Sequence, residues 1–230
     1  MKQILILLFS ILSVNSMAQN NQPTADWAGT NRYALENRNL KPPAKNENRV
    51  VFMGNSITES WKIIDSSFFA NSSYINRGIS SQTTVHMLAR FQQDVIALQP
   101  KVVVILAGIN DIAQNNGPIA IKDIFYNIVS MAQLAKANKI KVILCSVLPA
   151  FDFPWRRGLE PAEKIIRLNN LIEAYCKENK IVYVDYHSHM ADKRKGLPKK
   201  YADDEVHPTL AGYKIMEPLV NEAIQVALKK

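Results

Sequence analysis

The sequence predicts a three-layer α/β/α domain, in which a parallel sheet of five strands lies between two layers of helices. Short β-branched runs alternate along the chain with stretches of helical periodicity, which is typical of parallel strands joined by crossover helices. The strand-like runs are apolar on both alternating faces, so both faces of the sheet should be covered. With 230 residues, the chain is long enough for one such domain with a full hydrophobic core.

Five strands are expected, at residues 50–53, 74–76, 102–107, 141–147 and 181–185. Helices are expected between and after them, at residues 60–64, 83–98, 118–137, 160–178 and 209–228. In the second of these helices, Val85, Leu88, Phe91 and Val95 recur at near-helical spacing and predict one apolar face. Pro100 then ends the connection before the third strand.

The N-terminus has the three parts of a secretory signal. Lys2 precedes an apolar run at residues 4–14, and the triplet Ser16-Met17-Ala18 has the small residues of a cleavage site. We expect residues 1–18 to be removed and the protein to be periplasmic or secreted, with no stable membrane insertion after cleavage; a retained anchor helix is the less favoured alternative. Residues 19–48 are expected to form a tether with one short helix within residues 27–40, and residues 49–230 the domain.

Basic residues exceed acidic ones, 28 to 20, for a formal charge of +8. Loss of Lys2 with the signal would leave 28 − 1 = 27 basic residues and a charge of +7. The basic runs lack interleaved stacking aromatics, so a solvated basic face is favoured over nucleic-acid binding. Attraction to an acidic polymer or an anionic surface stays open.

Cys145 and Cys176 are too few for a disulfide framework or a CxxC metal site. Cys145 falls in a predicted buried strand and Cys176 in an amphipathic helix. Two separately buried thiols are favoured over a bond between them, because disulfide geometry is strict.

Three polar turns follow three predicted strands directly, at residues 54–58, 77–80 and 108–111. Ligands bind at the carboxyl ends of the strands in open parallel sheets, so these turns should converge on one rim. Taken singly, each has a structural explanation: Ser56 can cap a helix, Gly78 can supply a positive φ, and Asn110 can form a turn.

The far end of the chain supplies the complementary groups. Asp204 stands three residues before His207, which is followed by Pro208 and the last predicted helix. An Asp at this distance can orient the imidazole, and the imidazole can take a proton from a serine brought near in space. Together with Ser56, these residues make a nucleophile, a base and an orienting group.

These four blocks resemble those of the SGNH hydrolases, also called the GDSL family. The blocks are Gly54-Asn55-Ser56-Ile57-Thr58, then Gly78, then Gly108-Ile109-Asn110-Asp111, and then Asp204-Glu205-Val206-His207-Pro208. They stand in the family's order and cover the chain after residue 49. The resemblance implies a flavodoxin-like SGNH hydrolase fold and serine esterase activity.

The resemblance also implies residue roles. Ser56 would attack the ester carbonyl, His207 would act as its base and Asp204 would hold the imidazole. The oxyanion would be bound by the N–H groups of Ser56 and Gly78 and by the side-chain amide of Asn110. Asn55 stands where the family name has Asp, a change that should leave the turn's hydrogen bonds available.

Other candidate residues carry weaker signals. Phe151 and Trp155, in the loop at residues 149–158, are candidate substrate contacts together with Asn55, although that loop can equally be a structural cover. His187 and His189 lack a third ligand at convincing spacing, so a metal site there is disfavoured. No metal or cofactor is required by the expected chemistry.

The combined features predict an exported serine esterase that removes small acyl groups, chiefly acetyl, from an acylated carbohydrate. A lysophospholipase or thioesterase is a second reading of the same chemistry. A catalytically silent glycan-binding protein on this fold is a third, although the intact triad residues argue against it. A phosphodiesterase is least favoured, because the sequence has no phosphate-cradling glycine-rich loop.

Overall fold

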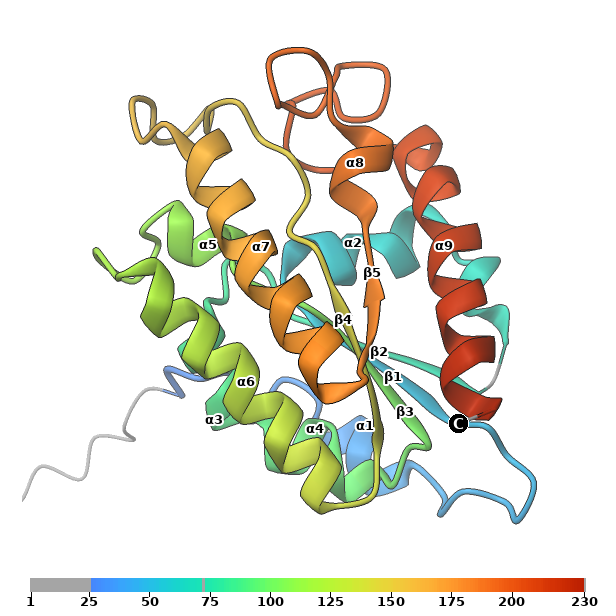
Figure 1. The fold of residues 1–230 in the computed structure, drawn as a ribbon. Coiled ribbons are helices and arrows are strands. Elements are labelled where there is room, and N and C mark those ends of the chain that lie inside the picture. Colours follow the sequence, from blue (N-terminus) through green and yellow to red (C-terminus); the bar gives the residue numbers. More distant parts are fainter. Residues whose placement is uncertain (1–25, 72, 230) are drawn as a thin grey trace, which may run out of the picture.

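The computed structural model describes residues 26–71 and 73–229, and within them five parallel strands form one sheet in the order β2-β1-β3-β4-β5 (Figure 1). The strands are β1 (Val50–Gly54), β2 (Tyr74–Gly78), β3 (Val102–Leu106), β4 (Lys141–Cys145) and β5 (Val182–Val184). Strand β1 pairs with β2 on one side and β3 on the other, with Val50 opposite both Tyr74 and Val102. The predicted five-stranded parallel sheet is confirmed.

Helices cover both faces of this sheet (Figure 1). Helices α2 (Ser56–Ile64) and α9 (Leu210–Lys229) lie on one face, where Trp61 stacks on Tyr213 with ring centroids 5.2 Å apart. The other face carries α3 (Thr84–Ala89), α4 (Phe91–Asp94), α6 (Ile121–Ala137) and α7 (Pro161–Asn179). The chain therefore has the three-layer arrangement that the sequence predicts.

Aromatic packing fixes α2 on the sheet. Trp61 is 1% exposed and stacks on Phe68 as well as on Tyr213, with an interplanar angle of 12° to Phe68. The ring of Phe52 on β1 meets Trp61 edge-on, and the Tyr213 hydroxyl donates to the carbonyl of Ile57 at 2.8 Å. Because large aromatic side chains bury much apolar area in defined geometries, this cluster holds the helix that begins with Ser56.

The prediction of a single helix over residues 83–98 is wrong. The chain instead forms α3, α4 and a 3-10 turn, η2 (Ile96–Leu98), with breaks at Arg90 and Val95. Arg90 has φ −99° and ψ 4°, and its fully buried guanidinium donates to the carbonyls of Gly54 and Arg77. A buried guanidinium needs hydrogen-bond acceptors, and reaching these two carbonyls requires Arg90 to leave the helical conformation. The helix therefore breaks here although the apolar residues around Arg90 keep helical spacing.

Several element ends also differ from the expected ones. Helix α2 begins at Ser56 instead of residue 60, because the Asn55 side chain caps it. Strands β3 and β4 end before residues 107 and 147, and β5 is confined to three residues. Two short helices, α5 (Ile109–Ile112) and α8 (Tyr186–Met190), were not predicted, since four or five residues are too few to display a period.

The segment before β1 packs against the domain from residue 26 onward. It contains α1 (Ala34–Asn39), inside the stretch where a short helix is expected. Tyr33 is 6% exposed, whereas Trp27 is 61% exposed and rests against His86 with ring centroids 5.3 Å apart. The expected signal peptide at residues 1–18 lies outside the described residues.

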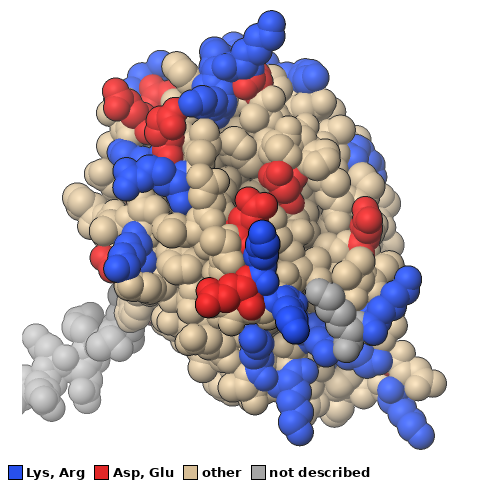
Figure 2. Space-filling view, in the orientation of Figure 1, with Lys and Arg blue, Asp and Glu red and all other residues tan. Residues whose placement is uncertain are grey.

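Both cysteines are buried free thiols, as the sequence favours. On the face shown in Figure 2, Lys and Arg gather in groups at the upper and lower ends, with Asp and Glu among them. At the amino ends of β4 and β5, a hollow of about 340 Å³ is lined by Lys136, Lys139, Lys141 and Lys180. Across residues 26–71 and 73–229, none of the helices combines the length and the apolar character needed to cross a bilayer.

Candidate active site

Three predicted site residues meet at the carboxyl ends of β1 and β3. Ser56 opens α2 directly after β1, Asn110 lies in α5 directly after β3, and His207 lies in the loop before α9. All three line one pocket of about 640 Å³. The chain leaves β1 for β2 on one side and has β3 on the other, which is the kind of crevice where open α/β sheets bind ligands.

Ser56, His207 and Asp204 form a continuous row of hydrogen bonds. The Ser56 hydroxyl oxygen is 3.0 Å from His207 Nε2, and His207 Nδ1 is 2.6 Å from Asp204 Oδ2. The other carboxylate oxygen of Asp204 accepts from the backbone N–H groups of His207, at 2.7 Å, and Val206, at 2.9 Å. The row has the geometry by which a carboxylate orients an imidazole and the imidazole activates a hydroxyl.

The Asp204 carboxyl is set up to remain ionised. Partial burial raises its pKa, but the hydrogen bonds from the His207 ring and from the two backbone N–H groups outweigh burial, and the net pKa lies below the ordinary 3.8. A carboxylate that stays charged through the neutral range favours the tautomer of His207 that carries its proton on Nδ1. Nε2 is then free to accept a proton from Ser56.

Asn55 is placed in the turn and not in the substrate pocket. It is 1% exposed, and its Oδ1 accepts from the N–H of Ile57 at 3.1 Å, which caps α2. Its Nδ2 is buried and has no hydrogen-bond partner among the described residues. The candidate role of Asn55 in substrate contact is therefore wrong, and its function is to begin the helix that carries Ser56.

Gly78 does not lie in the oxyanion position expected of it. Its N–H donates to Asn76 Oδ1 at 2.9 Å, and its carbonyl accepts the hydroxyl of Tyr33. A Cβ on Gly78 would come within 2.2 Å of the backbone nitrogen of Glu59. Glycine is required here because β2 passes directly beneath α2, so the reason for this glycine is packing and the expectation for it is corrected.

Ser81, and not Gly78, presents an unbonded backbone N–H beside the pocket. It lines the pocket with Ser56 and Asn110, and its φ is 65°. Its N–H makes no hydrogen bond to any atom of the described residues. No residue-type signal marks it, because a backbone donor belongs to every residue and a left-handed serine is uncommon. Only the polar pair at residues 80–81, close after a strand, could have indicated this turn.

Asn110 is held so that one amide hydrogen stays available. It is 4% exposed, and its Nδ2 donates to the carbonyl of Gln82 at 3.0 Å. An amide nitrogen carries two donors, so the second remains for a ligand. The N–H of Ser56, in the first turn of α2, is also outside the helix's own bonding pattern. Ser56, Ser81 and Asn110 thus bring three N–H donors to one pocket.

The two aromatic candidates in the loop at residues 149–158 line different hollows. Trp155 lines the pocket, and its ring lies 5.8 Å from that of His207. Phe151 instead lines a neighbouring hollow of about 220 Å³, where the guanidinium of Arg194 lies over its ring. The loop is tied across the pocket mouth by Arg156, which donates to the carbonyl of Gln114 at 2.6 Å. Phe151 is therefore corrected from a contact in the Ser56 pocket to a residue beside it.

His187 and His189 lie on α8, outside this pocket. Burial lowers the pKa of His187, and its backbone N–H donates to the Ser146 hydroxyl at 2.9 Å. His189 Nδ1 is 2.8 Å from the carbonyl of Asp185. Among residues 26–71 and 73–229, no three His, Cys, Asp or Glu side chains gather as a metal site.

Comparison with known proteins agrees with this geometry. The model of the GDSL-like lipase/acylhydrolase family matches residues 52–215. The chain belongs to this family. It is accordingly an SGNH/GDSL-type esterase on an α/β fold, and the matched segment runs from β1 into α9.

Individual relatives of this GDSL-type esterase extend the comparison. A GDSL-like lipase from Bacteroides thetaiotaomicron is 54% identical with a TM-score of 0.85, over 87% of this chain and 98% of that one. An acetylxylan esterase from Geobacillus stearothermophilus is 26% identical over 62% of this chain and 67% of the relative. Another, from Xylanibacter ruminicola, is 25% identical over 82% of this chain but only 45% of the relative's length.

Proposed function

We propose that the esterase acts through Ser56, His207 and Asp204. The observation that carries the proposal is the row of hydrogen bonds, 3.0 Å from Ser56 to His207 and 2.6 Å from His207 to Asp204, at the wall of a pocket with free N–H donors. His207 takes the proton of the Ser56 hydroxyl as its oxygen attacks the ester carbonyl. The protonated imidazole then delivers that proton to the departing alcohol.

The tetrahedral intermediate carries its negative charge on the former carbonyl oxygen. We place this oxygen among the N–H groups of Ser56 and Ser81 and the side-chain amide of Asn110. Collapse of the intermediate leaves an acyl group on Ser56, which a water activated by His207 removes by the same route. One donor of this kind typically contributes about 3 kcal/mol to transition-state stabilisation.

The favoured substrate is a small acyl ester, chiefly acetyl, on a carbohydrate. The pocket wall is mainly polar, with hydroxyl, amide, imidazole and guanidinium groups that suit sugar hydroxyls: Ser80, His86, Asn115, Asn116 and Arg156. Burial and the charge of Arg90 lower the pKa of His86, which keeps its ring neutral near pH 7. Trp155 adds an aromatic face on which a sugar ring can stack.

Two further considerations support a carbohydrate ester as substrate. The acetylxylan esterases among the relatives act on such a polymer, as their names state. The sequence of residues 1–18 has the parts of a secretory signal, so we propose that the protein acts after export, in the periplasm or outside the cell. Carbohydrate polymers would be accessible to the enzyme in either place.

The proposal is tested by comparing wild type with Ser56→Ala on 4-nitrophenyl acetate, 4-nitrophenyl decanoate and acetylated xylan fragments. Wild type should prefer the acetyl esters, and Ser56→Ala should lose activity by about 10³-fold or more, because nothing replaces the nucleophile. A fluorophosphonate probe should label wild type and not Ser56→Ala. Ser130→Ala, on the exposed side of α6, is the matched serine control and should behave as wild type.

Each other outcome has a definite meaning. Equal activity of wild type and Ser56→Ala would discard the mechanism. Faster hydrolysis of the decanoate than of the acetate would replace the carbohydrate esterase with a lipolytic acylhydrolase. Folded wild type that neither reacts with the probe nor cleaves any ester would indicate a glycan-binding protein.

A further inference from the structure

Residues 26–39 lie outside the segment matched by the family, yet they pack directly behind the oxyanion donors. We call this segment the strap. Its first turn is fixed by Asp26, whose carboxylate accepts from the N–H groups of Thr30, at 2.8 Å, and Asn31, at 2.7 Å. Within this turn, the carbonyl of Ala28 accepts from Gln82, in the turn at residues 79–82 that carries Ser81. Further along the strap, the Tyr33 hydroxyl donates to the carbonyl of Gly78, just before that turn.

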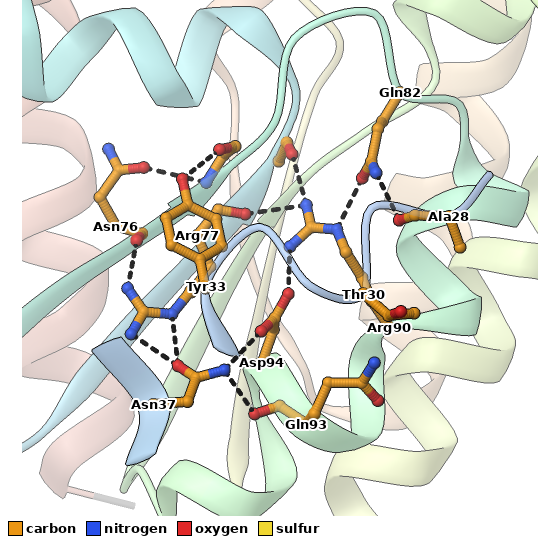
Figure 3. Close-up of polar contacts among 12 residues, drawn as sticks. Ala28, Thr30, Tyr33, Asn37, Asn76, Arg77, Gln82, Arg90, Gln93 and Asp94 are labelled. Carbon is orange, nitrogen blue, oxygen red and sulfur yellow. Dashed lines mark hydrogen bonds and ion pairs between the residues drawn. The ribbon is translucent and has the colours of Figure 1, made fainter. Parts of the chain in front are cut away.

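Gln82 connects the strap to the site, and Figure 3 shows its side chain between Ala28 and Arg90. Its Nε2 donates to the carbonyl of Ala28 in the strap at 2.7 Å, and its Oε1 accepts from Arg90 Nε at 2.6 Å. Its backbone carbonyl accepts from Asn110 Nδ2 at 3.0 Å. Gln82 also follows Ser81 directly, so a shift of Gln82 moves two of the three donors together.

A second row of hydrogen bonds runs from the half-buried Asn37 of the strap to Arg90, the residue that also bonds to Gln82 (Figure 3). Asn37 Nδ2 donates to Asp94 Oδ1 at 2.7 Å, and Asp94 accepts from Arg90 at 2.9 Å through its other oxygen. Asn37 Oδ1 also accepts from Arg77 at 2.7 Å. Arg90 and Asp94 are fully buried, so their bonding partners cannot be replaced by bulk water. The strap completes this buried network.

The outer part of the turn is tied to the strap and to α2. The carboxylate of Glu59 accepts from the N–H of Ser80 at 2.9 Å and also binds its hydroxyl. Arg32 of the strap donates to the same carboxylate at 3.2 Å. The turn at residues 79–82 is thus held on both sides of Ser81.

We infer that the strap positions the oxyanion donors Ser81 N–H and Asn110 Nδ2, with Gln82 and Tyr33 as positioning residues. The inference rests on the proposed esterase mechanism. Oxyanion stabilisation depends on donors that are already in place when charge develops, so small displacements lower turnover. Substrate binding through the polar wall should be affected much less. Loosening the strap should therefore reduce kcat and leave KM nearly unchanged.

The test uses Gln82→Glu and Tyr33→Phe in the full chain. Gln82→Glu keeps an acceptor for Arg90 but replaces the donor to Ala28 with a carboxylate oxygen that repels the Ala28 carbonyl, and Tyr33→Phe removes only the hydroxyl that bonds to Gly78. Each should lower kcat on 4-nitrophenyl acetate about tenfold with KM within about twofold, as expected for partial loss of an oxyanion donor. Leu35→Ala, an exposed strap residue, should match wild type.

A double-mutant cycle separates positioning from general destabilisation. In an Asn110→Ala background, Gln82→Glu should lower kcat by only about threefold, because one of the two donors that Gln82 positions is gone and only the N–H of Ser81 can still be displaced. An undiminished tenfold loss in that background would overturn the inference. So would unaltered kcat in both variants while wild type is active and Ser56→Ala is not.

Failure of the proposed function can be recognised separately. If wild type cleaves no ester, amide hydrogen exchange at residues 79–82 still reports on the turn. Faster exchange in Tyr33→Phe than in wild type and Leu35→Ala would support positioning by the strap without the esterase mechanism. Equal exchange in all three proteins would overturn it.

Discussion

At the scale of single residues, the glycine that ends β2 has a structural task. The N–H and carbonyl of Gly78 are both occupied within the protein, and its α-carbon faces the backbone of α2, so any side chain would push the two elements apart. Ser81, three residues later, offers its N–H to the pocket. Of these two backbone N–H groups, only that of Ser81 can bind a ligand, because that of Gly78 is already bonded within the protein.

We expect Gly78→Ala to lower the free energy of unfolding by about 2–3 kcal/mol, since the new methyl group meets backbone that cannot rotate away. Denaturant unfolding measures this, with Gly158→Ala as control: space is open at Gly158, where only its φ of 82° disfavours alanine. A Gly78→Ala protein of unchanged stability but with much lower kcat would return this residue to the oxyanion site.

At the scale of elements, Asp111 joins the two helices that border the pocket. It lies in α5 next to Asn110, and both its carboxylate oxygens accept from the N–H of Thr84, at 3.1 and 3.0 Å, where α3 begins. The Thr84 hydroxyl donates to it at 2.6 Å. Burial raises the pKa of Asp111 to about 6 and outweighs these hydrogen bonds, which lower it.

This pKa predicts how stability depends on pH. A carboxyl whose pKa is about 6 in the folded protein and 3.8 ordinarily favours folding in its neutral form. Its contribution is fully present below pH 3.8 and is lost as the pH rises through about 6. Asp111→Asn cannot ionise, so between pH 5 and pH 8 its free energy of unfolding should rise relative to that of wild type by about 1 kcal/mol.

Thermal or urea unfolding of both proteins at the two pH values checks this. Replacing the carboxyl by an amide also changes the free energy of unfolding by an amount that does not depend on pH, and this amount cancels when the two pH values are compared. A difference between the proteins that is the same at pH 5 and pH 8 would contradict the raised pKa.

At the scale of the whole molecule, one buried ion pair connects segments that are distant in the chain. Arg90 and Asp94 lie 2.9 Å apart with no exposed side-chain surface. Arg90 donates to the carbonyl ends of β1 and β2, and Asp94 accepts from the strap. The pair thus joins both strands and the N-terminal segment beneath the Ser56 pocket.

Arg90→Met should lower the free energy of unfolding by about 3–5 kcal/mol, because it leaves the buried Asp94 carboxylate without its ion-pair partner. The double variant Arg90→Met/Asp94→Leu should recover part of this loss, since it removes the unpaired charge as well. Urea unfolding of the three proteins gives the comparison. A double variant less stable than Arg90→Met would show that the charge of Asp94 is compensated elsewhere.

The sequence by itself determined the sheet and the choice of candidate catalytic groups. The β-branched runs and helical periods are local properties, so strand number, parallel direction and layers follow from them. Ser56, Asp204, His207 and Asn110 could be selected because each would act through its own side chain. The structure brings Ser56, His207 and Asn110 to one pocket, with Asp204 bonded to His207 behind it. Their roles in catalysis stay a prediction until the variants are measured.

Only the tertiary structure decided which backbone groups are free and which polar groups are buried together. The oxyanion role of Gly78, the substrate contact of Asn55 and the unbroken helix across Arg90 all failed for this reason. Phe151 lines a hollow beside the Ser56 pocket, and its contact with substrate stays a prediction. A backbone N–H looks the same at every position of a sequence, and the bonds that occupy or release it come from residues tens of positions away. The strap, similarly, shows no motif: its importance lies in the partners that folding places against it.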